Sequence, residues 1–268
     1  MIRILYATDF SPAAQSALDY IIHLAGDLGA TLDVIHIYKI PPLHSEADFT
    51  NMDTVLQEIK AAAEEKLNEL TSGIPSEILN TSSAIFGMFI PQEIVCYADK
   101  NNIDMIALGA KGEHNVLEHM LGSVTTHTML SSPVPVLSIP DKATYRAIKR
   151  IAYATDLNPK SFLPIATLKK IADRLGAELR IVNVKKDIDL PDMSDKSSYI
   201  LENISNFPVD IIVNPSVEEG LNNYIQTKEV DWLSLFIPRR RLWERIFHHS
   251  LSKQMFFHAH VPLLIYKE

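Results

Sequence analysis

The sequence is poor in cysteine and in cationic residues, and it has no long apolar run. Its one cysteine, Cys96, cannot close an intrachain disulfide or complete a zinc site, which favours a reducing compartment. The net charge is −8, so no broad cationic face for nucleic acid or anionic lipid is expected. No apolar run approaches the roughly 18 residues that span a bilayer, and the amino terminus becomes charged too early for a secretory signal. We therefore expect a soluble cytoplasmic protein without a nucleic-acid or membrane partner.

An internal repeat organises the chain. With 268 residues, 47% of them hydrophobic, it can bury a substantial core, and two domains are expected. Residues 2–12 read IRILYATDFSP and residues 149–159 read KRIAYATDLNP, which places Asp9 and Asp156 in the same local setting. The same offset of 147 positions continues through the helix and strand patterns that follow.

The two halves also end alike, but at a smaller offset. The closing segments SSPVPVLSIP and HAHVPLLIYK align Pro135 with Pro262, 127 positions apart. The second half has therefore lost 20 residues, and the loss falls where the first half carries a strong amphipathic helical pattern that begins at Asp53. We expect domains at residues 1–140 and 149–268, joined by a polar linker at 141–148.

Short β-branched apolar runs alternate with helical patterns in each half. The runs IRILYA, DMIALG and VPVLSI are almost continuously apolar, as expected of parallel strands that are covered on both faces. This order predicts an α/β fold of two tandem, doubly wound, five-stranded parallel-sheet domains, with ligands beyond the carboxyl ends of the strands. In the first half we expect strands near 2–7, 32–37, 77–83, 104–109 and 135–139, and helices near 12–28, 53–71, 91–101 and 122–131.

Asp9 is the first candidate site residue, because it lies between the first strand and a helix that opens with Ser11 and Pro12. A carboxylate at that edge can accept hydrogen bonds from an amino group or from the ribose hydroxyls of a nucleotide. Alternatively, Asp9 or Ser11 simply caps the helix, since Ser-Pro is a favourable N-cap and N1 pair. The residues alone leave both interpretations open.

A glycine-rich loop after the strand DMIALG is the second candidate site. Gly109, Gly112 and Gly122 follow the spacing G-x2-G-x9-G, and Ser123 then opens a helix. Glycines let the backbone approach a polyphosphate closely, while helix amides and the Ser123 hydroxyl can donate to phosphate oxygens. Alternatively, these glycines only shape turns and helix ends. Lys111 lies in the loop, but no G-x4-G-K-[ST] motif is present, which excludes a P-loop mechanism.

The motif G-x2-G-x9-G-[ST], together with YATDFS at the start and SSPVPVLSIP at the end, resembles the universal stress protein family in its ATP-binding branch. The likeness covers both halves as a tandem pair, and the motif is complete in the first. The resemblance implies an adenine nucleotide alpha hydrolase-like, Rossmann-like fold, a stress-response role and dimerisation through the last strand. It also implies ATP as the ligand, with or without magnesium. By motif position, the resemblance assigns adenine contact to Asp9, the nucleoside pocket to Ile37 after His36, and phosphate binding to Gly109, Gly112, Gly122 and Ser123.

The second half departs from this pattern, although Asp156 persists. The positions that match the three glycines and the serine hold Phe236, Arg239, His249 and Ser250. Side chains there would crowd a triphosphate, so we expect the second half to be degenerate and to bind no nucleotide.

The replacement loop, residues 238–249, is locally basic. The arginines form either an anion or partner surface or a solvated loop, and the solvated loop is the preferred interpretation. The histidines nearby lack metal-ligand spacing, so no metal site is expected. The arginines concerned are Arg239, Arg240, Arg241 and Arg245, and the histidines are His248, His249, His258 and His260.

Three functions remain open on the sequence. The preferred one is a regulatory module that binds ATP in its first domain. A slow ATP hydrolase is the second, although we assign no catalytic residue, since His114, His119 and His127 are near the glycine loop only in sequence. The third is a ligand-free scaffold, in which the closing strands pair the two halves as an intramolecular pseudo-dimer, with further association into a homodimer left open.

Overall fold

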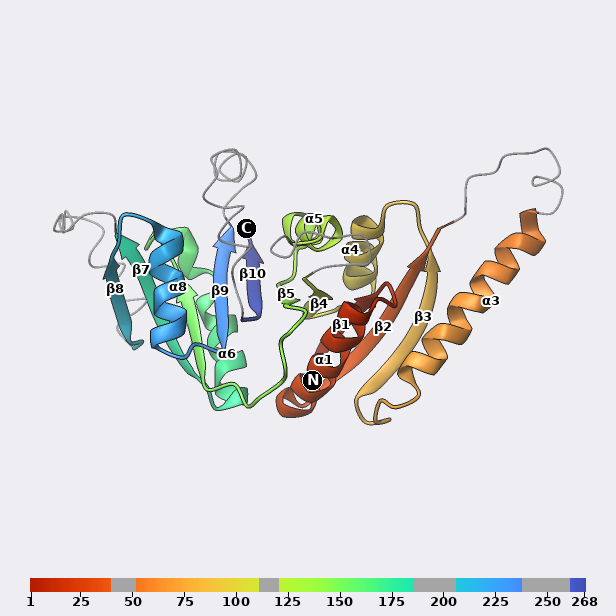
Figure 1. Ribbon diagram of the computed structural model, residues 1–268, viewed down its shortest axis with the longest axis horizontal. Helices are drawn as coiled ribbons and strands as arrows, with labels where there is room; N and C mark the ends of the chain where they lie inside the picture. Colours follow the sequence, from red (N-terminus) through yellow and green to blue (C-terminus); the bar gives the residue numbers. More distant parts are fainter. Residues whose placement is uncertain (40–51, 111–120, 186–205, 238–260) are drawn as a thin grey trace.

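The computed structural model describes residues 1–39, 52–110, 121–185, 206–237 and 261–268 (Figure 1). The strands within these residues are β1 (Ile2–Thr8), β2 (Ala30–Tyr38), β3 (Leu79–Phe86), β4 (Met105–Gly109), β5 (Val136–Ile139), β6 (Arg150–Ala154), β7 (Glu178–Lys185), β8 (Val209–Val213), β9 (Trp232–Ile237) and β10 (Leu263–Lys267). The helices are α1 (Pro12–Leu28), α3 (Met52–Thr71), α4 (Ile90–Lys100), α5 (Ser123–Ser131), α6 (Ile165–Leu175) and α8 (Val217–Thr227), with a short 3₁₀ helix at Pro159–Phe162.

All described strands belong to one ten-stranded sheet, with the order β3-β2-β1-β4-β5-β10-β9-β6-β7-β8. Every neighbouring pair is parallel except β5 and β10, which are antiparallel. The predicted α/β class is confirmed, and its two five-stranded parallel groups join edge to edge into a single sheet. Because the joining pair is antiparallel, the carboxyl ends of the two parallel groups lie at opposite edges of the sheet.

The strand registers follow the two sequence offsets. Tyr6 of β1 lies opposite Ala107 of β4, and Tyr153 of β6 lies opposite Ser234 of β9. Tyr6 and Tyr153 are 147 positions apart, and Ala107 and Ser234 are 127 apart. The sequence repeat is therefore a structural repeat, residue by residue, in these central strands.

Two apolar clusters cover the two faces of the sheet, and both extend across the two halves. One includes Leu18 of α1, Leu67 of α3 and Leu168 of α6. The other includes helix residues of α4, α5 and α8. The helices after β1, β2 and β6 thus lie on one face, and the helices after β3, β4 and β8 lie on the opposite face, as a doubly wound fold requires.

Helix α1 shows how local sequence sets an element that positions the candidate site. Ser11 is its N-cap, and the Ser11 side chain accepts a hydrogen bond from the Ala14 amide. Pro12 takes the first helical position, and Gly29 ends the helix with φ 59°, a left-handed conformation that glycine adopts readily. The helix therefore starts directly after the turn that carries Asp9.

Candidate functional site

The turn after β1 is held by hydrogen bonds between neighbouring side chains and amides. Asp9 Oδ1 accepts from the Ser11 amide at 3.0 Å, and Thr8 Oγ1 accepts from the Phe10 amide at 3.0 Å. Phe10 takes a φ of 63°, which these bonds support. Ser11 caps α1, so the capping alternative holds for Ser11. Asp9 is exposed at the sheet edge, beyond the carboxyl end of β1.

The same turn recurs after β6 with one added contact. Thr155 Oγ1 accepts from the amide of Leu157, whose φ is 57°, and Asp156 Oδ1 accepts from the Asn158 amide at 2.9 Å. Asp156 Oδ1 also accepts from the Ser161 hydroxyl at 2.7 Å. Ser161 stands where the first half has an alanine without a hydroxyl. The Asp156 carboxylate therefore accepts hydrogen bonds from both a backbone amide and a side-chain hydroxyl of its own half.

The carboxyl end of β4 meets the start of α5. Gly122 is the N-cap of α5, and its amide donates to the Ala110 carbonyl at 2.7 Å. The Thr125 hydroxyl donates to the Gly109 carbonyl at 2.8 Å, which ties the first turn of the helix to the strand end. Gly122 offers no side-chain acceptor to the helix, so the amides of the first turn remain suited to an anion.

Strands β1 and β4 are neighbours, so the Asp9 turn and the start of α5 both lie at the carboxyl ends of the parallel strands. Their printed register pairs Ile4 with Met105 and Tyr6 with Ala107, and its continuation places Thr8 level with Gly109. The strand order reverses between β1 and β4, and α1 and α5 accordingly lie on opposite faces of the sheet. This is the position at which doubly wound sheets hold ligands.

Ile37 is buried, with 6% of its surface exposed, so its side chain belongs to the core. An added Cβ at Gly87 would lie 3.0 Å from Ile37 Cγ2 and 2.4 Å from Glu93 Cγ, which shows how tightly this strand end is packed. Any ligand contact at Ile37 would therefore use its backbone.

His36 is a residue of this edge that the sequence reasoning used only as a marker for Ile37. Its Nδ1–H donates to the Thr8 carbonyl at 2.8 Å, and its ring lies 4.3 Å from that of Phe10. Burial lowers the pKa of His36 below its ordinary value, so the neutral ring is favoured. The structural repeat keeps this contact, because Asn183, 147 positions on, donates to the Thr155 carbonyl at 2.8 Å.

Several predicted residues lie outside the described part of the chain. These are Lys111, Gly112, His114, His119, Arg239, Arg240, Arg241, Arg245, His248, His249, Ser250, His258 and His260. Phe236, which replaces Gly109 in the second half, is described and packs against the core cluster that contains Tyr153.

Within the described ranges, no group of three or more potential metal ligands occurs. Nor does any described helix combine the length and apolarity needed to cross a membrane.

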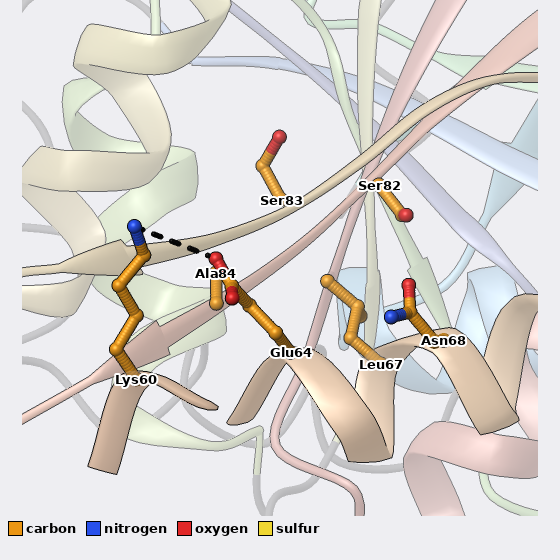
Figure 2. A pocket seen from close by; sticks show the side chains of 7 residues that line it. All are labelled: Lys60, Glu64, Leu67, Asn68, Ser82, Ser83 and Ala84. Atoms are coloured by element: carbon orange, nitrogen blue, oxygen red, sulfur yellow. Dashed lines mark ion pairs between the residues drawn. The ribbon is translucent and has the colours of Figure 1, made fainter. Parts of the chain in front are cut away.

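A pocket with a volume of about 340 Å³ lies between α3 and β3, separate from the predicted residues (Figure 2). Leu67 and Ala84 supply its apolar part. The Lys60 and Glu64 side chains that line it form a half-exposed ion pair at 3.5 Å. The charges that line the pocket are thus of both signs and lie next to each other.

The first half is a doubly wound α/β unit in which an acidic turn and a helix N-cap glycine meet at the reversal of strand order, the place where folds of this class hold their ligands. The model of the universal stress protein family matches residues 1–140. The chain therefore belongs to the universal stress protein family.

Known proteins resemble this chain in sequence or in three-dimensional structure. Universal stress protein A homolog 1 of Coxiella burnetii is 32% identical over 144 residues, which cover 51% of this chain and 94% of that protein. A universal stress protein from Archaeoglobus fulgidus superposes with a TM-score of 0.78 at 19% identity, over 99% of this chain and 98% of that one, and so shows the fold. A universal stress protein crystallised in complex with cAMP matches 53% of this chain and 98% of that one, at 18% identity and a TM-score of 0.37.

Proposed function

We propose that the first half of this chain binds an adenine nucleotide, ATP in the first instance, as a regulatory ligand of a stress-response protein. The observation that carries the proposal is the shared register of β1 and β4, which brings the Asp9 turn and the end of β4, next to the Gly122 helix start, to one edge. In this proposal the Asp9 carboxylate accepts from the adenine amino group, and the first-turn amides of α5 donate to phosphate at the same edge of the sheet.

Each predicted residue has a role in this proposal. Asp9 accepts from the base, and the Ile37 backbone borders the nucleoside. Gly109, Gly112, Gly122 and Ser123 hold the phosphates, and magnesium would bind through the phosphate oxygens. Family membership and the motif support these roles, together with the positions of Gly109, Gly122 and Ser123 around the start of α5.

The second half is proposed to be structural and to bind no nucleotide. Phe236 packs its side chain where Gly109 has none, and the Ser161 hydroxyl already occupies Asp156 Oδ1. Lys160 forms an ion pair with Glu268 at 2.8 Å, between the loop after β6 and the end of β10. At the second edge, groups of the chain itself therefore make contacts that would compete with a nucleotide.

We further propose that residues 1–140 and 149–268 are two domains of a cytoplasmic protein, joined by the linker 141–148 into an intramolecular pseudo-dimer. The antiparallel pairing of β5 with β10 supports this arrangement. The same pairing favours a second candidate function, a ligand-free scaffold, because the β5–β10 contact forms without a nucleotide.

Isothermal titration of ATP tests the proposal with a matched pair of variants. Asp9→Asn keeps the oxygen that accepts from Ser11 but removes the charge, so ATP binding should weaken by roughly tenfold or more, whereas Asp156→Asn should leave it unchanged. Gly122→Val should abolish binding while the circular dichroism spectrum is retained. No binding at millimolar ATP would favour the scaffold, and multiple turnover of ATP would establish a hydrolase.

A further inference from the structure

Glu93, in the first turn of α4, lies against the chain directly after β3. Gly87 leaves the space for it, because a Cβ at that position would overlap Glu93 Cγ and lie 3.0 Å from Glu93 Cδ. The same point is 3.0 Å from Ile37 Cγ2, so the Glu93 side chain lies beside Ile37. Any side chain at position 87 would therefore displace Glu93 from the end of β2 and β3.

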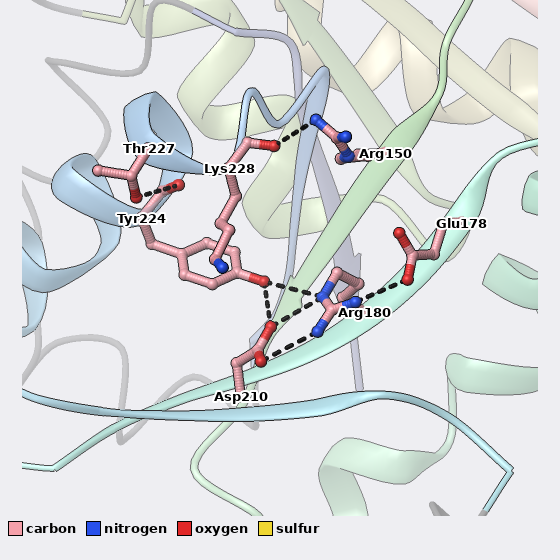
Figure 3. Close-up of polar contacts among 7 residues, drawn as sticks. All are labelled: Arg150, Glu178, Arg180, Asp210, Tyr224, Thr227 and Lys228. Atoms are coloured by element: carbon pink, nitrogen blue, oxygen red, sulfur yellow. Dashed lines mark hydrogen bonds and ion pairs between the residues drawn. The ribbon is translucent and has the colours of Figure 1, made fainter.

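Helix α8 takes the place of α4 in the second half, 127 positions on. The Arg3 side chain of β1 donates to the carbonyl of Asn101, directly after α4. Arg150 of β6, 147 positions on from Arg3, donates to the carbonyl of Lys228, directly after α8, at 2.8 Å (Figure 3). Each helix is thus fixed in the same way to the first strand of its half. Residues 127 positions apart on the two helices can therefore be compared.

The repeat exchanges glycine and side chain at this contact. Gly87 and Glu93 correspond to Asn214 and Gly220. A Cβ at Gly220 would lie 3.1 Å from Asn214 Cβ, so here the strand end carries the side chain and the helix carries the glycine. Asn214 Oδ1 accepts from the Ser216 amide at 2.8 Å and so closes its own turn. Only the half that carries the glycine motif therefore places a carboxylate at this point.

Glu93 extends the candidate site along the sheet edge. The strand order β3-β2-β1-β4 places Glu93 at one end of a row and the start of α5 at the other. Asp9 and Ile37 lie between them and are level with each other, because Thr8 pairs with His36. Helices α4 and α5 pack together on one face of the sheet. Three strand spacings separate β3 from β4, about 14 Å, so a nucleotide with its phosphates at α5 would extend its base toward Glu93.

We propose that Glu93 makes the nucleotide site of the first half selective for adenine; this role rests on the proposed function. The amino group at C6 of adenine carries two hydrogens, of which Asp9 accepts one and Glu93 the other. A 6-oxopurine has an oxygen at C6, which offers no hydrogen and would face both carboxylates. A site built to accept from a ligand N–H rejects an analogue that lacks it. The ligand class is therefore the 6-aminopurine nucleotides.

Isothermal titration of the full chain with ATP and with inosine triphosphate, which has oxygen at C6, measures this selectivity. The wild type should prefer ATP by about 100-fold or more. Glu93→Gln keeps the size of the side chain, removes its charge and adds an amide that can donate to the C6 oxygen. Its preference for ATP should fall by about tenfold or more, with inosine triphosphate bound more tightly than by the wild type. Glu93→Ala should also lose preference, but without that gain.

Glu219→Gln is the matched control, because it removes a carboxylate from the first turn of α8, the counterpart helix. It should leave the preference for ATP unchanged. A wild type that binds both nucleotides equally, or Glu93 variants that keep the wild-type preference, would overturn the role of Glu93 while ATP binding stands. A wild type that binds no ATP would overturn the proposed function as well. Thermal unfolding of each variant confirms that it is folded.

Discussion

The indole nitrogen of Trp232 on β9 donates a hydrogen bond to the hydroxyl oxygen of Tyr20 on α1, at 2.8 Å. Trp232 is fully buried and Tyr20 is 3% exposed, so this bond between the two halves is shielded from water. Nearby, the ring of Tyr145 packs edge-on against Tyr20, and its hydroxyl donates to Asp27. The helix that begins at the candidate site thus also contacts the second half.

Removal of the Tyr20 hydroxyl should destabilise the protein. Tyr20→Phe leaves the buried indole N–H without an acceptor, which should lower the free energy of unfolding by about 1–3 kcal/mol. Tyr266→Phe is the matched control, since the Tyr266 hydroxyl is buried and finds no hydrogen-bond partner in the part of the chain that the structure describes. Its removal should be neutral or stabilising in urea unfolding. Equal losses in both variants would contradict this account.

His36 should make stability depend on pH near neutrality. Its folded pKa is lowered, chiefly by burial, so the unfolded chain binds a proton before the folded chain does. Its contribution is therefore present above the unfolded pKa of about 6.5 and is lost as pH falls from that value through the lowered folded pKa. His36→Asn copies the Asn183 contact to a backbone carbonyl and has no titratable ring.

Denaturant unfolding at about pH 7.5 and pH 5.5 checks this expectation. The wild type should lose more stability between the two values than His36→Asn, because only the wild type carries the ring. A variant that loses as much as the wild type would show that other groups account for the acid sensitivity.

Two arginines at equivalent positions of the repeat should differ in their contribution to the free energy of unfolding. Arg3 pairs with Asp33, a fully buried carboxylate, at 2.7 Å, whereas its counterpart Arg150 pairs with the exposed Glu229 at 3.1 Å. Arg3→Met leaves a buried charge without its cation and should cost about 3 kcal/mol. Arg150→Met should cost at most about 1 kcal/mol, as expected of an exposed pair. Thermal or urea unfolding compares the two, and a reversed order would refute the burial argument.

Most of the first half could be predicted from local sequence. The helix expected at 12–28 is α1 to the residue, since an N-cap serine, a first-turn proline and a terminal glycine mark both ends. The strand expected at 77–83 is instead Leu79–Phe86. Its polar residues give no apolar alternation, and its end is decided by pairing with β2.

Part of the candidate site could also be predicted from local sequence. Asp9, Gly109 and Gly122 were expected at strand and helix ends, and the structure places them there. Their nucleotide remains a prediction. The contact of His36 with the Thr8 carbonyl could not be read from spacing, because it joins residues on adjacent strands through a side chain.

The sequence by itself determined the repeat, the parallel α/β class and the family, because apolar periodicity, end signals and a spaced glycine motif are local properties. Only the tertiary structure decided that β5 and β10 merge two sheets into one and that the Trp232 indole donates to the Tyr20 hydroxyl. These contacts join residues that are far apart in the sequence. Local apolar periodicity is compatible with several strand pairings, so it does not specify which strand edges pair or which buried donors meet an acceptor.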